Sequence, residues 1–235
     1  MNLSMTRIQA IFMKDYKEFV RNYAVSIMAL MPLILAFGFN KMGISDIQTY
    51  LMTINIVFSL VTAYVQCCLI AEEKEKKTLR SLMLSPATLG DILIGKSLFV
   101  LVLSSAVVAL TVYLLGYKPA NLLLLSIALL LSALFYIGIG TFCGLYTKTI
   151  MEASVIILPV MFIFIGGPMV FAMSEAYPIL KIAEWLPSTQ LSLLAEVLEG
   201  NYSSTDIIIP FVTILLWTIL TWLVTAFFYK KRMVD

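Results

Sequence analysis

The chain has 235 residues, of which 61% are hydrophobic and only 13% are charged, and its formal net charge at pH 7 is +2. A soluble globular domain has more charged and fewer apolar residues, so this composition excludes that class of protein. The sequence predicts an integral membrane protein.

The N-terminal arm, residues 1–22, is predicted to form an amphipathic helix on the membrane surface. It is either a plain anchor or an elbow that also touches a partner protein. Apolar side chains recur at helical spacing, and basic side chains gather on the opposite side. The apolar residues are Ile8, Ile11, Phe12, Tyr16, Phe19, Val20 and Tyr23, and the basic ones are Arg7, Lys14, Lys17 and Arg21.

Six apolar runs of about 17 to 25 residues follow, and each is long enough to cross the hydrocarbon core as a helix. The alternating pattern of a membrane β-barrel does not occur. We place the spans at residues 23–39, 50–71, 97–116, 120–145, 153–173 and 207–229. The predicted fold class is an all-α membrane protein with six transmembrane helices in a single domain, residues 1–235.

Basic residues are distributed unevenly about these spans. Thirteen of the 16 lysines and arginines lie in the arm, between residues 74 and 96, at Lys148 or in the C-terminal tail. Because cytoplasmic loops carry an excess of Lys and Arg, both termini and residues 72–96 are predicted to be cytoplasmic. The basic residues are then a topological signal beside anionic lipid, and we expect no nucleic-acid partner.

The second span carries a polar stripe on one helical face, formed by Asn55, Ser59, Thr62 and Gln66. A polar stripe in lipid must face protein or water. The stripe is therefore either a hydrogen-bonding seam between helices or a wall of a substrate path.

A charged island, residues 72–80, separates the second and third spans and must lie outside the bilayer. Leu79, Leu82 and Met83 recur at helical spacing behind the charges. This pattern predicts a short surface helix over residues 73–84, with an apolar ridge that suits a soluble partner.

Ser85 and Pro86 are expected to end this surface helix and start the next one, because Ser is a favoured N-cap and Pro suits the first helical position. The surface helix would then be joined rigidly to the third span. Residues 90–97 also fit the phosphate-loop pattern of two glycines followed by Lys-Ser. A true phosphate loop follows a buried strand, and no strand precedes residue 90, so we interpret this match as accidental.

Residues that carry chemistry are scarce. The chain has no histidine, and Cys67, Cys68 and Cys143 all lie within apolar runs. These patterns favour neither a disulfide framework nor a zinc site. Without a histidine base or a carboxylate pair inside the spans, we expect no catalytic, cofactor-binding or metal-binding residues.

The fourth and fifth spans contain small residues and prolines. Gly140 and Gly144 form a small-xxx-small pair that predicts a close helix crossing. The helix of the fifth span is expected to be interrupted, which makes it a candidate hinge or gate. The interrupting residues are Pro159, Gly166, Gly167 and Pro168.

The outward segment before the last span, residues 174–206, contains a helix-like run that is too short to cross the membrane. One interpretation is a helix lying on the outer leaflet, anchored by Tyr177 and Trp185. The residues of the run that share a face are Leu191, Leu194, Ala195 and Leu198.

These features together resemble the ABC-2 type transporter permeases. The six spans, the amphipathic arm and the short segment before the last span all fit that family. Lys77 and Arg80 stand where the family's usual pattern has a glycine and an acidic residue. The motifs that carry the resemblance are Glu73-Lys74-Glu75, Thr78-Leu79, Leu82, Ser85-Pro86 and Ile94-Gly95-Lys96.

The resemblance implies a role for each part of the chain. Residues 1–22 would be the elbow, 23–71 the first two spans, 72–96 the cytoplasmic coupling region, 97–173 the next three spans, 174–206 a re-entrant segment, and 207–235 the last span and tail. A coupling helix would dock on a separate ATPase subunit, which binds ATP and Mg, while this chain binds no cofactor. The docking residues would be Glu73, Glu75, Thr78, Leu79, Leu82, Met83, Ser85 and Pro86.

The expected function is the permease subunit of an ATP-driven exporter in the plasma membrane, paired with a second permease as a homodimer or a paralogous heterodimer. Apolar spans without buried charges favour a hydrophobic or amphipathic cargo, which we expect to be a toxin or antimicrobial peptide. Small permeases of this size resemble Gram-positive exporters of amphipathic peptides such as phenol-soluble modulins, or systems that confer resistance to peptide antibiotics. The alternatives are a stand-alone channel, a membrane scaffold that recruits a cytosolic protein, or an ABC permease for a lipid or drug.

Overall fold

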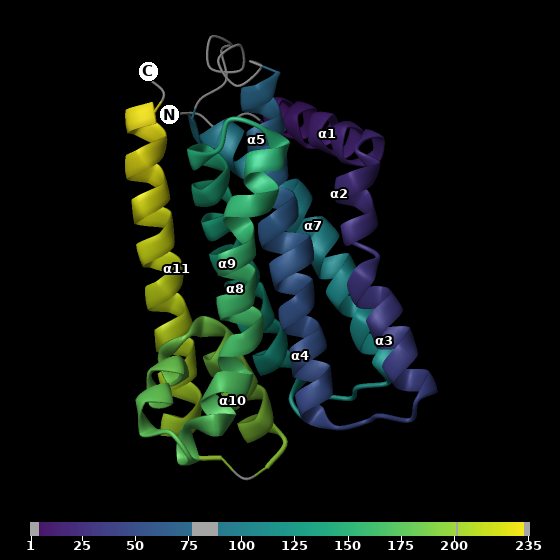
Figure 1. The fold of residues 1–235 in the computed structure, drawn as a ribbon, viewed down its shortest axis with the longest axis vertical. Helices are drawn as coiled ribbons and strands as arrows, with labels where there is room; N and C mark the ends of the chain where they lie inside the picture. Colours follow the sequence, from purple (N-terminus) through teal and green to yellow (C-terminus); the bar gives the residue numbers. More distant parts are fainter. Residues whose placement is uncertain (1–4, 77–88, 201, 233–235) are drawn as a thin grey trace.

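The computed structural model describes residues 5–76, 89–200 and 202–232, and every element within these ranges is a helix (Figure 1). In chain order the elements are α1 (Met5–Arg21), α2 (Tyr23–Met28), α3 (Met31–Lys41), α4 (Ile47–Val57), η1 (Phe58–Tyr64), α5 (Val65–Glu75), α7 (Leu89–Leu115), α8 (Leu122–Tyr146), α9 (Ile150–Ala172), η2 (Met173–Glu175), η3 (Pro178–Trp185), α10 (Pro187–Leu198) and α11 (Ser204–Arg232).

Six helical stretches of the described chain are long and apolar enough to cross a membrane, and they confirm the predicted all-α membrane fold. The first span combines α2 and α3, with Pro32 in the first turn of α3, where its missing N–H costs nothing. The second combines α4, the π-helix η1 and α5. The six stretches are Tyr23–Lys41, Ile47–Glu75, Ile94–Leu115, Leu122–Tyr146, Ile150–Glu175 and Ser204–Phe228.

The two ends of the bundle differ in construction. Helix α1 lies across one end, beside the last turn of α5, and this end is called the α1 end below (Figure 1). Helices η3 and α10 lie at the opposite end, called the α10 end. The predicted helix in the N-terminal arm is therefore present as α1, and it packs against α7.

The second span runs through the centre of the bundle. Its most apolar window is 89% buried, against 22% for the first, fifth and sixth spans. Helix α8 packs on one side against η1 and α5 and on the other against α11. Because protein surrounds the second span, its polar side chains are shielded from lipid.

The predicted close crossing at Gly140 and Gly144 is confirmed. A Cβ on Gly140 would lie 2.4 Å from the carbonyl oxygen of Ala63, and a Cβ on Gly144 would lie 2.7 Å from the Cβ of Ile70. Both glycines therefore allow α8 to approach η1 and α5 more closely than any other residue type would permit.

The predicted interruption of the fifth span is wrong, because α9 runs from Ile150 to Ala172 with Pro159 and Pro168 inside it. A proline removes one backbone donor, and a membrane helix packed among neighbours tolerates that loss. Gly167 serves packing: a Cβ there would lie 2.9 Å from Leu186 Cδ1. The sequence signals of a break thus belong to a continuous helix that touches the start of α10.

Helix α10 has the predicted apolar face, and this face packs inside the bundle. Leu191, Leu194, Ala195 and Leu198 are all buried. The helix packs against α4, α8, α9 and α11. The apolar face of α10 is therefore covered by protein, and the re-entrant and interfacial interpretations of residues 174–206 stay predictions.

Candidate functional site

The residues predicted to dock a partner fall into two groups. Glu73 and Glu75 lie in the last turn of α5. The others lie outside the described residues: Thr78, Leu79, Leu82, Met83, Ser85 and Pro86. The site can therefore be built from the helix ends on either side of residues 77–88.

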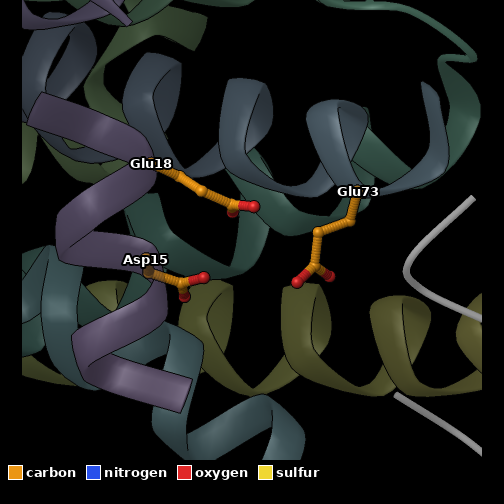
Figure 2. Close-up of side chains that lie close together, drawn as sticks. All are labelled: Asp15, Glu18 and Glu73. Atoms are coloured by element: carbon orange, nitrogen blue, oxygen red, sulfur yellow. The ribbon is translucent and has the colours of Figure 1, made fainter. Parts of the chain in front are cut away.

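A buried ionic node joins three helices at the α1 end. A carboxylate oxygen of Glu73 on α5 lies 2.9 Å from Nζ of Lys96 on α7, and the same Nζ lies 3.3 Å from Asp15 Oδ1 on α1. Lys14 on α1 forms a second ion pair with Glu73. Asp15, Glu73 and Lys96 are all buried. Figure 2 shows Asp15 and Glu73 directed toward each other from α1 and α5, with Glu18 beside them.

Glu73 therefore differs from the sequence-based expectation, which put it on an exposed docking helix. The helix α5 continues through the first charges of the island to Glu75 and carries Glu73 against α1 and α7. The expectation that the spans contain no buried charges is also wrong at this end, because Glu73 and Lys96 lie inside span boundaries and are buried. They are tolerated because each is paired with an opposite charge.

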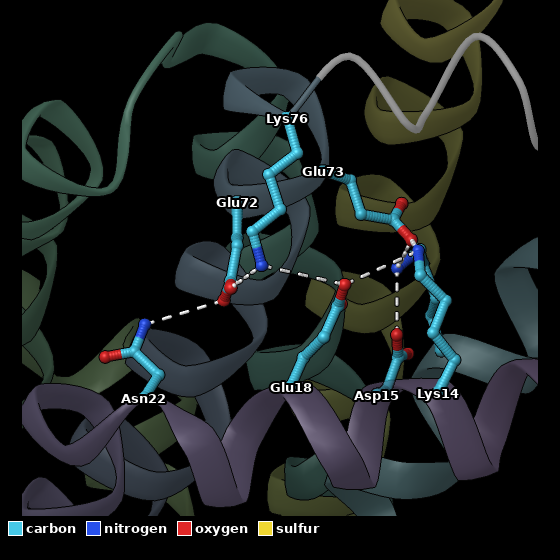
Figure 3. Close-up of polar contacts among 8 residues, drawn as sticks. Lys14, Asp15, Glu18, Asn22, Glu72, Glu73 and Lys76 are labelled. Atoms are coloured by element: carbon cyan, nitrogen blue, oxygen red, sulfur yellow. Dashed lines mark hydrogen bonds and ion pairs between the residues drawn. The ribbon is translucent and has the colours of Figure 1, made fainter.

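A second, more exposed row of polar contacts runs beside the node (Figure 3). Lys76 Nζ donates to Glu72 Oε1 at 2.5 Å and lies 3.9 Å from Glu18 Oε1. Asn22, which caps α2, donates from Nδ2 to Glu72 Oε2 at 3.5 Å. The last turn of α5 is thus attached to the second half of α1 and to Asn22 just after it.

Close apolar packing fixes α1 over the node. Gly95 lies beside Ile11, and a Cβ on Gly95 would lie 2.9 Å from Ile11 Cβ. Phe99, one turn further along α7, packs edge-on against Phe12 and in a tilted orientation against Phe19. The Gly95-Lys96 motif therefore has a local explanation, since Gly95 admits α1 and Lys96 neutralises the acids that α1 and α5 bring together.

The end of α5 is also attached on its other side, to the turn between α8 and α9. Lys74 Nζ donates to the carbonyl oxygen of Leu145 at 2.6 Å. Glu75 Oε2 accepts from the backbone N–H of Ile150 at 2.9 Å, one of the N–H groups at the start of α9 that no turn of the helix can bond. The last turn of α5 consequently contacts α1, α7 and the α8–α9 turn.

Burial changes the protonation behaviour of the acids that α1 contributes. Burial raises the pKa of Asp15 to about 6, against the lowering effect of nearby Lys96, and the negative charge of Glu73 adds to the rise. Burial also raises the pKa of Glu18. Because their charged forms are disfavoured, Asp15 and Glu18 bind protons more readily than free carboxylates do.

A metal ion is the other species that three close carboxylates can hold. Oxygen atoms of Asp15, Glu18 and Glu73 lie within 4.8 Å of one another (Figure 2). However, the ammonium groups of Lys14 and Lys96 already pair with these acids. A metal would have to displace them, so the donor set suits an ion-pair network better than a metal centre.

The segment that matches the phosphate-loop pattern is helical. Residues 90–97 lie within the continuous helix α7, which begins at Leu89. The lysine of the pattern, Lys96, is directed to Asp15 and Glu73. A helix presents its backbone N–H groups to its own carbonyls and cannot wrap a phosphate.

The polar stripe of the second span is buried inside the protomer. Asn55 Nδ2 donates to Ser192 Oγ on α10 at 3.3 Å, and Gln66 Nε2 donates to Thr141 Oγ1 on α8 at 2.9 Å. Ser59 and Thr62 between them lie in the π-helix η1 and are also buried. Two of the four side chains thus bond to neighbouring helices, and both predicted roles of the stripe stay predictions.

The candidate hinge residues lie apart from the node, toward the α10 end. Gly166 and Pro168 line a cavity of about 540 Å³ between α4, α9 and α10, whereas Gly167 packs against α10. Pro159 lies inside α9, nearer its start. The structure thus brings Gly166 and Pro168 together at one cavity and leaves Pro159 elsewhere.

Sequence reasoning missed Asp15, Lys14 and Lys96 as parts of a functional site. A signal was present, because Asp15 follows Ile8 and Ile11 on the same helical face and an acid on an apolar face needs a cationic partner. The partner itself is 81 positions away in the chain and could not be identified by spacing.

Comparison with known proteins agrees with this architecture. A search of curated proteins found no significant match. The profile of a protein family, described as ABC-2 family transporter protein, matches residues 2–228. That match includes α1, the helix ends of the ionic node and nearly all of the last span. The chain belongs to the ABC-2 family of transporter proteins.

Proposed function

We propose that this chain is the permease subunit of an ATP-driven exporter. Residues 77–88 would dock on a separate ATPase subunit, and a second permease would complete the membrane part. The observation that carries the proposal is the buried ionic node of Asp15, Glu73 and Lys96, which fastens both ends of this segment to α1. ATP and Mg would be bound by the ATPase, not by this chain.

The node supports mechanical coupling because of where its members lie. Glu73 precedes residues 77–88 and Lys96 follows them, and the two are held 2.9 Å apart. Removing one partner of a buried ion pair costs about 3–5 kcal/mol, because the other charge is left buried without compensation. The pair therefore resists separation. A force on the segment would therefore move the second and third spans together with α1, as one body.

Charge distribution supports the orientation. Four basic residues lie on α1, and three described lysines lie at the ends of α5 and α7 nearest to it: Lys74, Lys76 and Lys96. By the positive-inside rule the α1 end faces the cytoplasm, where an ATPase subunit has its substrate. The α10 end then faces outward, and both termini lie inside.

Co-purification from detergent tests the docking surface. The double variant Leu79→Asp, Met83→Asp should lose association with the ATPase, because charges on the apolar ridge would oppose burial in a protein groove. The matched control is Ile179→Asp, which places the same charge on a side chain that is 84% exposed at the α10 end. Unchanged association of the double variant would overturn the docking model.

The proposed cargo is a hydrophobic or amphipathic peptide, moved outward. The support is the apolar composition of the spans, together with the position of the buried charges, which gather at the α1 end. ATP-dependent uptake of a fluorescent amphipathic peptide into inside-out vesicles tests direction and cargo together. Uptake should require both the permease and the ATPase, and uptake without ATP would contradict the proposal.

A further inference from the structure

A cavity at the α10 end has charges of only one sign in its lining. It has a volume of about 540 Å³ and lies between α4, α9 and α10. Among the residues that the structure describes, its charged lining residues are Asp46 and Glu196, and none of the described lysines or arginines lines it. A volume of this size is typical of sites for small molecules or for one end of a larger ligand.

Asp46 is held rigidly at the cavity. It is the N-cap of α4, where its carboxylate accepts from the backbone N–H of Thr49 at 2.8 Å and from the Thr49 hydroxyl. These hydrogen bonds lower the pKa of Asp46, so the group is ionised at neutral pH. The N-cap therefore supplies a fixed negative charge to the cavity.

Glu196 supplies the second carboxylate from α10. Partial burial raises its pKa, because the ionised form is poorly solvated there. A cation near Glu196 would replace the missing solvation. The cavity thus has one preformed negative charge and a second one that a cationic ligand would stabilise.

Two residues of α10 at the cavity wall, Thr189 and Ser192, carry buried hydroxyl groups. Thr189 is 1% exposed, and its Oγ1 has no hydrogen-bond partner among the described residues. Ser192 beside it is already engaged, since its Oγ accepts from Asn55 Nδ2 and donates to the carbonyl of Ser188. A buried hydroxyl without a partner is costly, so the wall of the cavity at Thr189 is less well satisfied than at Ser192.

The rest of the lining is apolar. Side chains from three helices form it, among them Leu51 and Met52 of α4, Ile165 and Met169 of α9, and Leu193 of α10. A small hydrated ion gains nothing from such walls, whereas a chain with methylene groups does. The recognised chemistry is therefore a positive charge attached to an apolar body.

We propose that this cavity binds the ammonium-bearing end of a cationic amphiphile, with the ammonium between Asp46 and Glu196 and the apolar portion against α4, α9 and α10. The identification of this ligand as cargo rests on the proposed export function, which the site makes more specific. An ammonium group also occurs on phosphatidylethanolamine. With this site the cargo must carry a positive charge, a requirement that does not follow from the apolar spans alone.

Photolabelling of the full-length permease in membranes tests the site without ATP or a partner. The probe is an octyl chain with a diazirine and a terminal primary ammonium, compared with the same probe ending in a hydroxyl. The ammonium probe should label peptides from α4, α9 and α10 at least tenfold more than the hydroxyl probe. Equal labelling by the two probes would overturn the proposal.

Matched variants locate the charge that matters. Asp46→Asn with Glu196→Gln should abolish the preference for the ammonium probe, and Asn is itself a good N-cap, so α4 keeps its start. Glu175→Gln is the control, because Glu175 is an exposed acid toward the same end that does not line the cavity. An unchanged preference in the double variant would refute the site.

Two competition arms identify the source of the ammonium. A soluble lysine-containing amphipathic peptide should suppress labelling, whereas enriching the membrane in phosphatidylethanolamine should not. Suppression by the lipid alone would overturn the assignment to cargo. Labelling without ATP-dependent export would support the site and refute the proposed function. Export without labelling would support the proposed function and refute the site.

Discussion

The ammonium group of Lys96 lies 2.9 Å from a carboxylate oxygen of Glu73, and each side chain is at most 1% exposed. This contact joins the end of the second span to the start of the third, across residues 77–88. Because Lys96 also contacts Asp15 and Glu73 contacts Lys14, the same pair holds α1 in place.

Replacing Lys96 by Met should destabilise the permease by about 3–5 kcal/mol, because Asp15 and Glu73 would remain buried with one fewer cation. Thermal unfolding of the purified protein measures the loss. Adding Glu73→Gln to Lys96→Met should recover part of the stability, since the uncompensated charge is then removed. The control is Lys118→Met, which should have little effect because Lys118 is exposed and lies just beyond the other end of α7. Equal stability of Lys96→Met and Lys118→Met would show that the ionic node does not stabilise the folded permease.

Asp15 should make stability depend on pH in a defined direction. Its pKa rises from 3.8 to about 6 in the folded protein, so the folded state binds the proton more tightly than the unfolded state between these values. The free energy of unfolding should therefore fall as the pH rises from about 4 to 6, by at most about 3 kcal/mol from this group. The midpoint of thermal unfolding, measured across this range, should fall less steeply with pH in Asp15→Asn. Parallel curves for the two proteins would contradict the assignment.

Alanine at two glycines should have opposite effects on stability. Gly140→Ala would place a Cβ 2.4 Å from a backbone oxygen that cannot move aside, so we expect a loss of about 1–3 kcal/mol. Gly166→Ala meets nothing within 4 Å and should be neutral or stabilising by up to about 1 kcal/mol. Chemical unfolding in mixed micelles distinguishes them. The export rate of Gly166→Ala also tests the candidate hinge, because a rate equal to that of the wild type would exclude a requirement for glycine there.

Asn55→Leu with Gln66→Leu should lower stability by about 1–2 kcal/mol, because each change removes a hydrogen bond between helices. Thermal unfolding and the fraction of dimer in size-exclusion chromatography are measured together with export. A stable, dimeric double variant that fails to export would show instead that the stripe forms part of the path.

The spans and the glycine crossing could be predicted from the sequence because they depend on local composition. An apolar run long enough to cross the bilayer is a membrane helix whatever surrounds it, and Gly140 with Gly144 marks a close contact without naming the partner. The node could not be predicted in the same way. Lys14, Asp15, Glu73 and Lys96 come from three segments that only the folded bundle brings together.

The errors have physical causes too. Pro159 and Pro168 indicated a broken helix, but neighbouring helices support α9 through both positions. Glu73 was expected on the surface because the charged island begins nearby, yet one further turn of α5 brings it between two lysines. In both cases the local pattern was read correctly, and contacts with distant segments decided the outcome.

Glu73 and Lys96 flank residues 77–88, and Asp15 lies on α1, so all three lie outside that segment. Under the docking function proposed above, residues 77–88 could diverge without removing a member of the ionic node, and a permease could change its ATPase partner by changes in this short segment alone. Exchanging residues 77–88 between related transporters should then transfer the choice of ATPase subunit while leaving the membrane helices unaltered.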